Sequence, residues 1–395
     1  MKPEILAPAG NWAMLNAAIN AGADAVYFGI KGYNMRHSAS NFTIEDLKEI
    51  GKLKIKKYLA LNTIIFDNEI DKVKKILDTA KSCTIDAVIC WDLAVVELAK
   101  NLGLDVHLST QASVSNSISA EFYKKLGIKR IILARELNLK QIQDIKEKVN
   151  IEVEVFVHGA MCVSLSGRCF MSHFLMHKSA NRGKCFQPCR RPYIIKDKEL
   201  NYELEVGNNY ILSPKDLCAM PIIDKILSSN IDSIKIEGRS KSPEYVDIVV
   251  RCYRKAVDAY YDNKLSEQLK NELLAELKTA YNRTFSTGFL ESFPLNEWAT
   301  SEGNESKVKK EEIGIVLNYY KKSQVALIKV TANSFKLNDT LLFTGNKTGV
   351  VRQVVNSIML NDKNVDIAQK GDIVTVKVLN LVRENDKVFN LRQGL

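Results

Sequence analysis

The chain has 395 residues, of which 26% are charged and 46% are hydrophobic, and its formal net charge is +10 with a pI near 9.0. This composition is typical of a globular protein and excludes a largely disordered or fibrous chain. The length exceeds what one hydrophobic core usually supports, so we expect one large domain and at least one smaller one. The excess of lysine and arginine favours polyanionic partners such as RNA.

The opening residues contain no apolar signal-peptide core, and no stretch reaches the roughly 18 apolar residues of a membrane span. We therefore expect a cytoplasmic protein without a membrane partner. In that reducing compartment the eight cysteines favour metal binding or redox chemistry over a disulfide framework.

The first part of the chain alternates short β-branched runs with longer helical patterns, which is the signature of repeated βα units. Eight candidate strands predict an α/β fold, a TIM-like (β/α)8 barrel over residues 1–298. The candidate strands are 4–7, 25–28, 58–61, 87–90, 106–108, 130–133, 153–157 and 233–236. An open doubly wound sheet is the alternative, but APAGNW after the first strand lacks the Gly-rich dinucleotide fingerprint.

About 75 residues separate the seventh and eighth candidate strands, which is far longer than an ordinary βα loop. This connection defines an insertion at about 159–230, and it contains four clustered cysteines. The loops that follow the strands build the active sites of such barrels, so we expect the cysteine-rich insertion to cover the functional face.

Helical patterns follow at 243–262 and at 266–281, and the polar segment 299–312 is predicted to be a linker. Beyond it the apolar period changes to two, over the runs 315–319, 325–330, 340–343, 350–355, 373–378 and 388–391. We predict a small C-terminal β-barrel over 313–395, which is either an RNA-binding module or a plain accessory module.

The four clustered cysteines are Cys162, Cys169, Cys185 and Cys189. Their spacing lacks the two-residue knuckles of zinc ribbons. Four thiolates on one loop suit a four-iron, four-sulfur cluster, because soft iron prefers sulfur and nearby basic residues balance the charge. The segment therefore predicts an iron–sulfur site.

The alternative for any cysteine is that it is an ordinary buried apolar residue. We expect this of the three cysteines on apolar strand or helix patterns, Cys83, Cys90 and Cys252. Cys218 is either a core residue or a substitute ligand.

The insertion is strongly basic, with no Asp or Glu from 155 to 196. We predict that basic residues beside the cysteines contact RNA. These residues are Arg168, Lys184, Arg190 and Arg191. Aromatic residues of the same segment can stack on unpaired bases or pack the loop, and they are Phe170, Phe174, Phe186 and Tyr193.

Polar residues at the carboxyl ends of the predicted strands are the candidate catalytic groups. His158 ends the seventh strand, and it is either a general base or a structural, hydrogen-bonded histidine. Arg135 and Arg239 lie at the ends of the sixth and eighth strands and can bind carboxylate or phosphate. Gln111 and Glu237 are further strand-end candidates, with satisfied loop hydrogen bonds as the alternative.

Several motifs resemble those of the U32 family of collagenase-like peptidases. They are APAG at 7–10, STQA at 109–112, EVFVHGAMC at 154–162, GRCFMS at 167–172, SANRG at 179–183, CFQPCR at 185–190, SPKD at 213–216 and KIEGR at 235–239. The resemblance covers the whole predicted barrel, and the C-terminal β-domain also looks like the module of that family.

This resemblance implies two activities. The family name implies a peptidase of unassigned catalytic type, whereas similar members perform 5-hydroxylation of the wobble uridine of tRNA, with prephenate as a small anionic co-substrate. Those members carry a four-cysteine iron–sulfur cluster, and the matching positions are Cys162, Cys169, Cys185 and Cys189.

We therefore expect an iron–sulfur-dependent tRNA hydroxylase. A peptidase remains the alternative, although the chain contains neither H-E-x-x-H nor G-x-S-x-G. A further alternative is a cluster-bearing scaffold that works with a paralogous partner subunit.

Overall fold

The computed structural model describes residues 2–37, 39–165, 167–206, 212–295, 297–300 and 303–393. Eight parallel strands close into a barrel, because the last of them pairs with both the first and the seventh. The strands are β1 (Glu4–Ala9), β2 (Ala25–Gly29), β3 (Lys56–Ala60), β4 (Ala87–Cys90), β5 (Asp105–Leu108), β6 (Arg130–Ile132), β7 (Glu152–Gly159) and β11 (Ser233–Ile236). The predicted barrel is confirmed, and each candidate strand overlaps an observed one.

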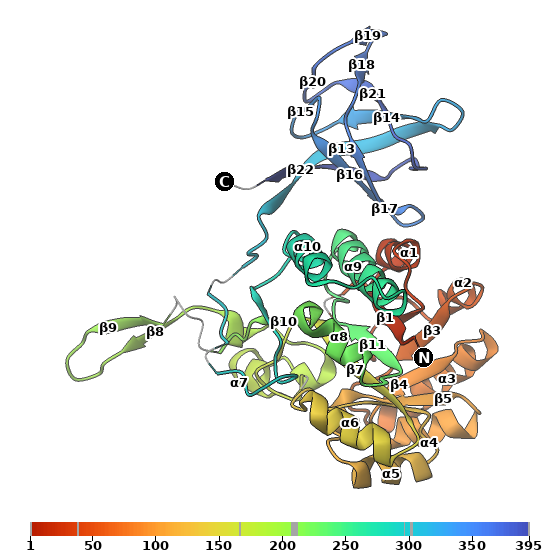
Figure 1. The fold of residues 1–395 in the computed structure, drawn as a ribbon, viewed down its shortest axis with the longest axis vertical. Coiled ribbons are helices and arrows are strands. Elements are labelled where there is room, and N and C mark those ends of the chain that lie inside the picture. Colours follow the sequence, from red (N-terminus) through yellow and green to blue (C-terminus); the bar gives the residue numbers. More distant parts are fainter. Residues whose placement is uncertain are drawn as a thin grey trace.

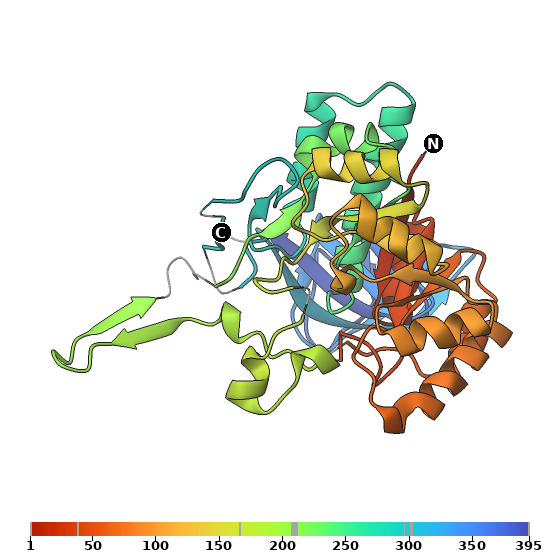
Figure 2. The ribbon, with the colours of Figure 1, turned by 90° about the horizontal axis from the view of Figure 1, so that it is seen from below.

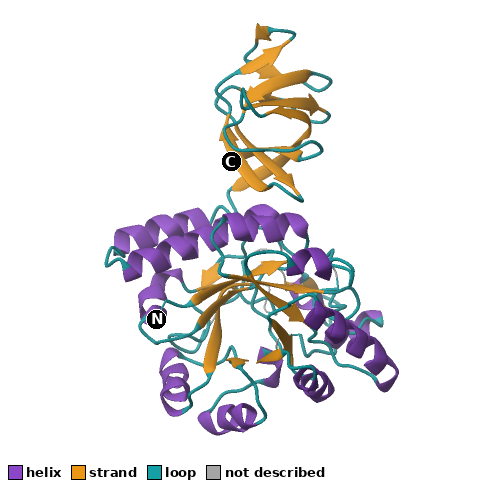
Figure 3. Ribbon diagram, turned by 90° about the vertical axis from the view of Figure 1, so that its right-hand side faces the viewer, coloured by secondary structure: helices purple, strands orange, loops and turns teal. Residues whose placement is uncertain are grey.

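Helices surround the barrel on its outer face (Figure 3). They are α1 (Trp12–Asn20), α2 (Leu47–Gly51), α3 (Ile70–Ser82), α4 (Leu93–Asn101), α5 (Ser117–Lys125), α6 (Leu139–Lys148), α8 (Ile223–Leu227), α9 (Pro243–Tyr261) and α10 (Glu267–Leu277). Polar caps set their starts: Asn11 accepts a hydrogen bond from the Met14 amide, and Asn138 forms a capping box with Gln141. Each long helix then buries an apolar stripe, such as Val73, Ile76 and Leu77 of α3, against the outside of the strands. None of the helices in the described ranges is long and apolar enough to cross a membrane.

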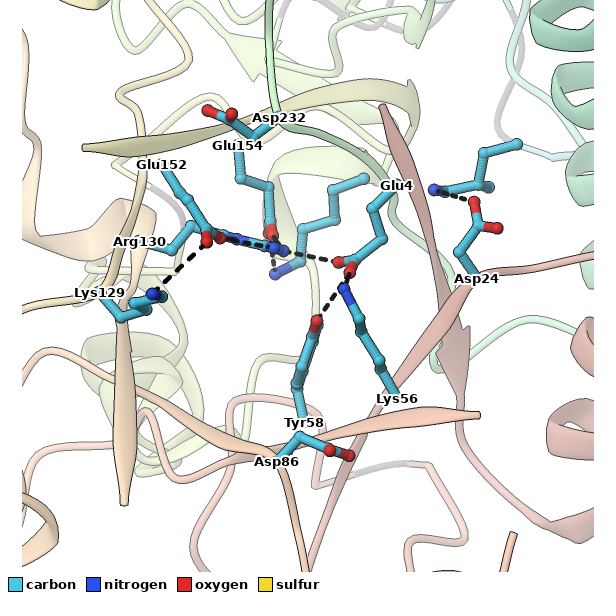
Figure 4. Close-up of polar contacts among 12 residues, drawn as sticks. Glu4, Asp24, Lys56, Tyr58, Asp86, Lys129, Arg130, Glu152, Glu154 and Asp232 are labelled. Carbon is cyan, nitrogen blue, oxygen red and sulfur yellow. Dashed lines mark hydrogen bonds and ion pairs between the residues drawn. The ribbon is translucent and has the colours of Figure 1, made fainter. Parts of the chain in front are cut away.

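The inside of the barrel is partly charged (Figure 4). Arg130 lies between Glu4 at 2.6 Å and Glu154 at 3.2 Å, and Tyr58 donates a hydrogen bond of 2.8 Å to Glu4. Glu154 also binds the ammonium of Lys235 at 2.9 Å. Because Glu4 begins β1 while Lys235 reaches the opposite end, this network links the two ends of the barrel interior.

The long connection after β7 contains α7 (Met171–Met176) and a hairpin of β8 (Tyr193–Lys196) and β9 (Glu203–Val206). The hairpin projects away from the barrel (Figures 1 and 2). Its last part differs from the predicted insertion, because β10 (Asp216–Cys218) pairs antiparallel with β7 and parallel with β12 (Phe285–Ser286). The residues from β10 to α8 therefore belong to the barrel framework.

The C-terminal domain is an antiparallel sheet with the order β17-β16-β22-β13-β14-β21-β18-β19. These strands are β13 (Val308–Tyr320), β14 (Val325–Val330), β16 (Thr340–Gly345), β17 (Gly349–Val354), β18 (Ile358–Leu360), β19 (Lys363–Asn364), β21 (Ile373–Lys377) and β22 (Lys387–Gln393), and β15 (Phe335–Lys336) pairs with β20 (Ile367–Ala368). All six predicted runs fall on strands. The prediction that 308–312 is linker is wrong, because these residues form a ladder with β22.

The C-terminal domain packs on α1 and α9 of the barrel (Figure 1). Asn16 donates to the Asn346 carbonyl at 2.7 Å, and Asn20 donates to the Thr348 carbonyl at 3.1 Å. Arg352 lies 3.5 Å from the buried carboxylate of Asp247. The two domains therefore meet through directional polar contacts beside a small apolar cluster of Ala17, Leu342 and Val350.

Candidate active site

A cavity of about 660 Å³ opens at the carboxyl ends of the barrel strands. Its floor and walls come from β2, β3, β4, β6, β7 and β11 and from the loops that follow them, and the cysteine-rich segment contributes Cys162, Cys185 and Cys189. Such a position is where barrels of this type place their active sites. The predicted candidates Arg135, Gln111, Glu237 and Arg239 all line this cavity.

The described lining of the cavity is strongly cationic. It contains a single carboxylate, that of Glu237, and seven basic side chains. The basic side chains are Arg36, Arg135, Arg190, Lys235, Arg239, Lys241 and Arg283. Such an excess of one charge in a concave, partly desolvated site favours an anionic ligand.

The carboxylate of Glu237 is already engaged. Oε1 of Glu237 accepts from Nε of Arg36 at 3.0 Å and lies 2.9 Å from its Nη2. Burial alone would raise the pKa of Glu237, but the guanidinium groups of Arg36, Arg239 and Arg135 outweigh burial and lower it. Glu237 is therefore ionised and neutralises only one of the seven cations.

Several guanidinium nitrogens around the cavity have no partner among the described residues. They are Nε and Nη2 of Arg135, Nε of Arg239 and Nε of Arg283. Arg135 lies over the ring of Phe156, 4.7 Å from its centroid, and Nη1 donates to the Ala160 carbonyl at 2.9 Å. Burial lowers the pKa of Arg135, and it lowers the pKa of Arg239 to about 10. Buried donors without acceptors are costly, so an anion in the cavity would stabilise this arrangement.

Two lysines of the last barrel strand and its loop also face the cavity. Lys235 lies over the ring of Tyr27, 4.4 Å from the centroid, and Lys241 lies over the ring of Tyr281 at 3.4 Å. Burial lowers the pKa of Lys235, although its ion pair with Glu154 opposes that effect. Burial also lowers the pKa of Lys241, to about 8.

The four clustered cysteines lie close enough to influence one another. Burial raises the pKa of Cys189; Arg190 lowers it, and Cys162, Cys185 and Cys169 raise it further. Three of the thiol sulfurs accept a backbone N–H at 3.4 Å from the residue two positions later in the chain, namely Cys162, Cys169 and Cys185. Amide hydrogen bonds to cysteine sulfur are a feature of iron–sulfur sites.

These contacts fit a sulfur-ligated cluster in donor type and in electrostatic environment. The side-chain positions do not form a ready metal site, because the described residues contain no group of three or more His, Cys, Asp or Glu placed to hold one metal ion. Cys218 is separate from this region. It is buried in the barrel core, and burial raises its pKa to about 12.

His158 does not reach the cavity, contrary to the interpretation of this residue as a general base. It is buried among the rings of Tyr245, Tyr253 and Phe285. Burial lowers its pKa to about 3, so the imidazole is neutral. A register shift between β7 and β11 leaves His158 opposite Ile236, and the buried, neutral ring supports the structural alternative.

The predicted RNA-binding residues separate into two groups. Arg168, Lys184 and Arg191 are exposed. Arg190 instead turns inward and donates to Ser213 Oγ at 2.8 Å and to the Met161 carbonyl at 2.5 Å. Its guanidinium is therefore part of the cavity wall rather than of the outer surface.

Four cavity cations were not predicted from the sequence. Lys235 and Lys241 could have been found, because they share the alternating spacing of Glu237 and Arg239 in the segment 235–241. Arg36 and Arg283 follow no such pattern, and only the fold brings them to the cavity.

The model of peptidase family U32 matches residues 10–300, which include the barrel after its first strand, the cavity lining and the four cysteines. The chain belongs to this family. Among similar proteins, an uncharacterized protease of Methanocaldococcus jannaschii is 45% identical, over 99% of both chains. A collagenase of Porphyromonas gingivalis is 38% identical over 98% of this chain and 97% of its own. The tRNA hydroxylation protein P1 of Bacillus subtilis is 36% identical over 95% of this chain and 91% of its own.

Proposed function

We propose that this U32 family member is an iron–sulfur-dependent RNA hydroxylase, which performs 5-hydroxylation of the wobble uridine of tRNA with prephenate as the hydroxyl donor. The observation that carries the proposal is the cationic cavity bordered by the four-cysteine segment. The similarity to a tRNA hydroxylation protein over nearly the whole chain supports the choice of substrate.

Cys162, Cys169, Cys185 and Cys189 would hold the cluster. When bound, a cluster of this type supplies one-electron transfer or a Lewis-acidic iron beside the cavity. The amides of Ser164, Met171 and Gln187 would direct N–H groups at three of the ligating sulfurs. Such hydrogen bonds stabilise the anionic thiolates.

The guanidinium groups of Arg135 and Arg239 would bind the carboxylates of prephenate. Arg135 has two unpaired buried donors, which suit bidentate contact with a carboxylate, and Arg239 has one, which would add a single hydrogen bond. Lys235, fixed by Glu154, contributes a further cation at the floor. These cations would balance the charge of two carboxylates.

The peptidase alternative has less support from the cavity. A hydrolase needs an activated nucleophile or a positioned base. Among the described lining residues there is no histidine, and the single carboxylate, Glu237, is paired with Arg36. The peptidase alternative is favoured by the names of two relatives, an uncharacterized protease and a collagenase.

Iron and sulfide analysis of anaerobically purified protein, followed by nucleoside analysis of tRNA, tests the proposal. We expect about four irons and four sulfides per chain, and 5-hydroxyuridine in tRNA that disappears when the gene is deleted. Cys162→Ser should lose the cluster and the 5-hydroxyuridine. Cys83 lies outside the cavity, so Cys83→Ser should retain the cluster and the 5-hydroxyuridine.

Two results would contradict the hydroxylase. The first is a chain that stays free of iron after anaerobic reconstitution. The second is unchanged 5-hydroxyuridine in the deletion strain, which together with collagen or gelatin cleavage would favour the peptidase.

A further inference from the structure

Two short segments of the cysteine-rich insertion repeat one pattern. GRCF at 167–170 and GKCF at 183–186 each contain glycine, a basic residue, cysteine and phenylalanine. The glycines have φ of +87° and +79°, a region that favours glycine. In both segments the cysteine sulfur accepts an amide two residues later at 3.4 Å. We call these segments the Gly-basic-Cys-Phe turns.

The two turns lie side by side. A Cβ on Gly167 would lie 2.5 Å from Cε of Met35, and a Cβ on Gly183 would lie 3.2 Å from the Cα of Met35. Both turns therefore pack against Met35. Ser172, which follows the first turn, accepts a hydrogen bond from the Phe186 amide at 3.0 Å. The turns therefore form one surface, and their glycines and Cys185 place it at the mouth of the cavity.

This surface presents aromatic rings to solvent. Phe170 is 63% exposed and Phe186 is 51% exposed. Phe174 is 82% exposed, and its ring centroid lies 6.3 Å from that of Phe170. Clustered exposed rings of this size mark an interaction surface, because they lose stabilisation unless a partner covers them.

The charge around the rings identifies the chemistry of the partner. Arg168 and Lys184 each precede a cysteine of a turn, and no acidic residue occurs from 155 to 196. Arg168 is exposed while it stacks on Trp91, 4.8 Å from the ring centroid. Lys184 is exposed and has no ion-pair partner among the described residues. A polyanion with flat apolar faces, which is unpaired RNA, matches both properties.

We propose that the Gly-basic-Cys-Phe turns form a stacking platform for unpaired nucleotides of an RNA loop. Phe170 and Phe186 stack on bases, and Arg168 and Lys184 contact the adjacent phosphates. The choice of RNA rests on the proposed function, and the platform adds how the loop is held at the cavity mouth.

Fluorescence of a stem–loop RNA with 2-aminopurine in its loop tests the platform. We use the anaerobically reconstituted full chain and expect quenching of 2-aminopurine on binding. The double variant Phe170→Ala/Phe186→Ala should lose the quenching and bind the loop at least about tenfold more weakly. Its affinity for a fully paired duplex of the same base composition should equal that of the native chain. Lys184→Ala should reduce the slope of log affinity against log salt by about 0.7.

Matched controls separate stacking from damage to the insertion. Phe293→Ala removes an exposed ring elsewhere, and Lys74→Ala removes an exposed cation on α3. Both should leave loop binding unchanged. Phe170→Tyr/Phe186→Tyr should restore quenching, and iron content should equal that of the native chain in every variant compared.

Unchanged loop affinity in the double alanine variant would overturn the platform. An equal loss of loop and duplex binding would also overturn it, because stacking requires unpaired bases. Loss of self-association without loss of RNA binding would assign the surface to a second copy of the chain. Native protein that binds the loop but yields no 5-hydroxyuridine would refute the proposed function and leave the platform intact.

Discussion

Glu154 shows at the scale of single residues how the barrel interior accommodates charge. It is fully buried and lies between the guanidinium of Arg130 at 3.2 Å and the ammonium of Lys235 at 2.9 Å. A buried ion pair contributes little net stability as a whole, but removal of one partner leaves an uncompensated charge. Glu154 compensates two cations, so it holds both of them in place.

We expect Glu154→Gln to lower the free energy of unfolding by about 3 kcal/mol, because the buried ammonium of Lys235 loses its anion, while Arg130 keeps Glu4 and Glu152. Urea denaturation measures this loss. Glu49→Gln is the matched control, since Glu49 pairs with Lys52 on the surface and both side chains are more than half exposed. The control should change stability by less than about 1 kcal/mol. Equal effects of the two substitutions would contradict the central role of Glu154.

Lys241 is a cavity residue whose pKa is lowered toward neutrality. Burial lowers this pKa to about 8, Asp216 opposes the shift, and Arg283 and Arg190 add to it. Glu237 also faces the group and raises its pKa slightly. Below pH 8 the ammonium is charged in both the folded and the unfolded chain, so its burial opposes folding there. Between pH 8 and the unfolded pKa of about 10.4 only the unfolded chain keeps the proton, so stability rises with pH.

The same titration predicts how anion binding depends on pH. An anion in the cavity favours charged Lys241, so affinity for prephenate should fall roughly tenfold between pH 8 and pH 9.5. Isothermal titration calorimetry measures this decrease. Lys241→Arg should flatten the profile, because arginine stays charged over this range. A profile of the native chain that is already flat would exclude Lys241 from the anion site.

At the scale of elements, the loops after the strands decide the shape of the site. The loop after β2 carries Arg36 to Glu237 and also supports the second Gly-basic-Cys-Phe turn. A Cβ on Gly183 would lie 2.3 Å from the carbonyl oxygen of Asn34, which is rigid backbone. Contact between these two loops therefore requires glycine.

Gly183→Ala should shift the turn and weaken anion binding in the cavity. Gly32→Ala is a matched control, because Gly32 has φ of +94° but nothing lies within 4 Å of its Cβ position. The control should cost about 1 kcal/mol of stability from backbone strain alone. Gly183→Ala should cost at least twice as much, measured by urea denaturation. Equal costs would show that the contact with Asn34 is easily relaxed.

At the scale of the whole molecule, the C-terminal domain is fixed to the barrel by polar contacts and by a small apolar cluster of Ala17, Leu342 and Val350. Asn16 and Asn20 of α1 donate to backbone carbonyls of the β16–β17 turn. Lys310 of β13 also binds Glu244 of α9 at 2.7 Å. These contacts predict a defined orientation between the two domains rather than free rotation about 303–307.

The double substitution Asn16→Ala/Asn20→Ala should loosen this interface. Two lost hydrogen bonds cost about 2 kcal/mol together, which is roughly a thirtyfold increase in opening. Trypsin cleavage at the exposed Lys307 should accelerate accordingly. Asn101→Ala on α4 is the control and should leave the cleavage rate unchanged. Prephenate affinity should also remain, because neither asparagine lines the cavity.

The strands of both domains could be predicted from local pattern, because apolar runs with period two and regular spacing depend only on neighbouring residues. The start of the C-terminal domain at residue 308 could not be predicted in this way, because residues 308–312 are polar and become a strand only through pairing with β22. The cysteine segment was visible for the same local reason: its residue types and spacing are in the sequence. Whether the four thiols hold a cluster stays a prediction.

The composition of the cavity was decided by tertiary structure. Arg36, Lys235 and Arg283 come from segments more than 40 residues apart, and only barrel closure brings them to one site. Local sequence also does not reveal whether a polar side chain points into the cavity or into the core. His158 lies in the core, at a register shift between β7 and β11, whereas Arg190 lies in the cavity wall, where it donates to Ser213 and Met161. Long-range pairing sets these directions, because side-chain orientation depends on which backbone packs against each strand end.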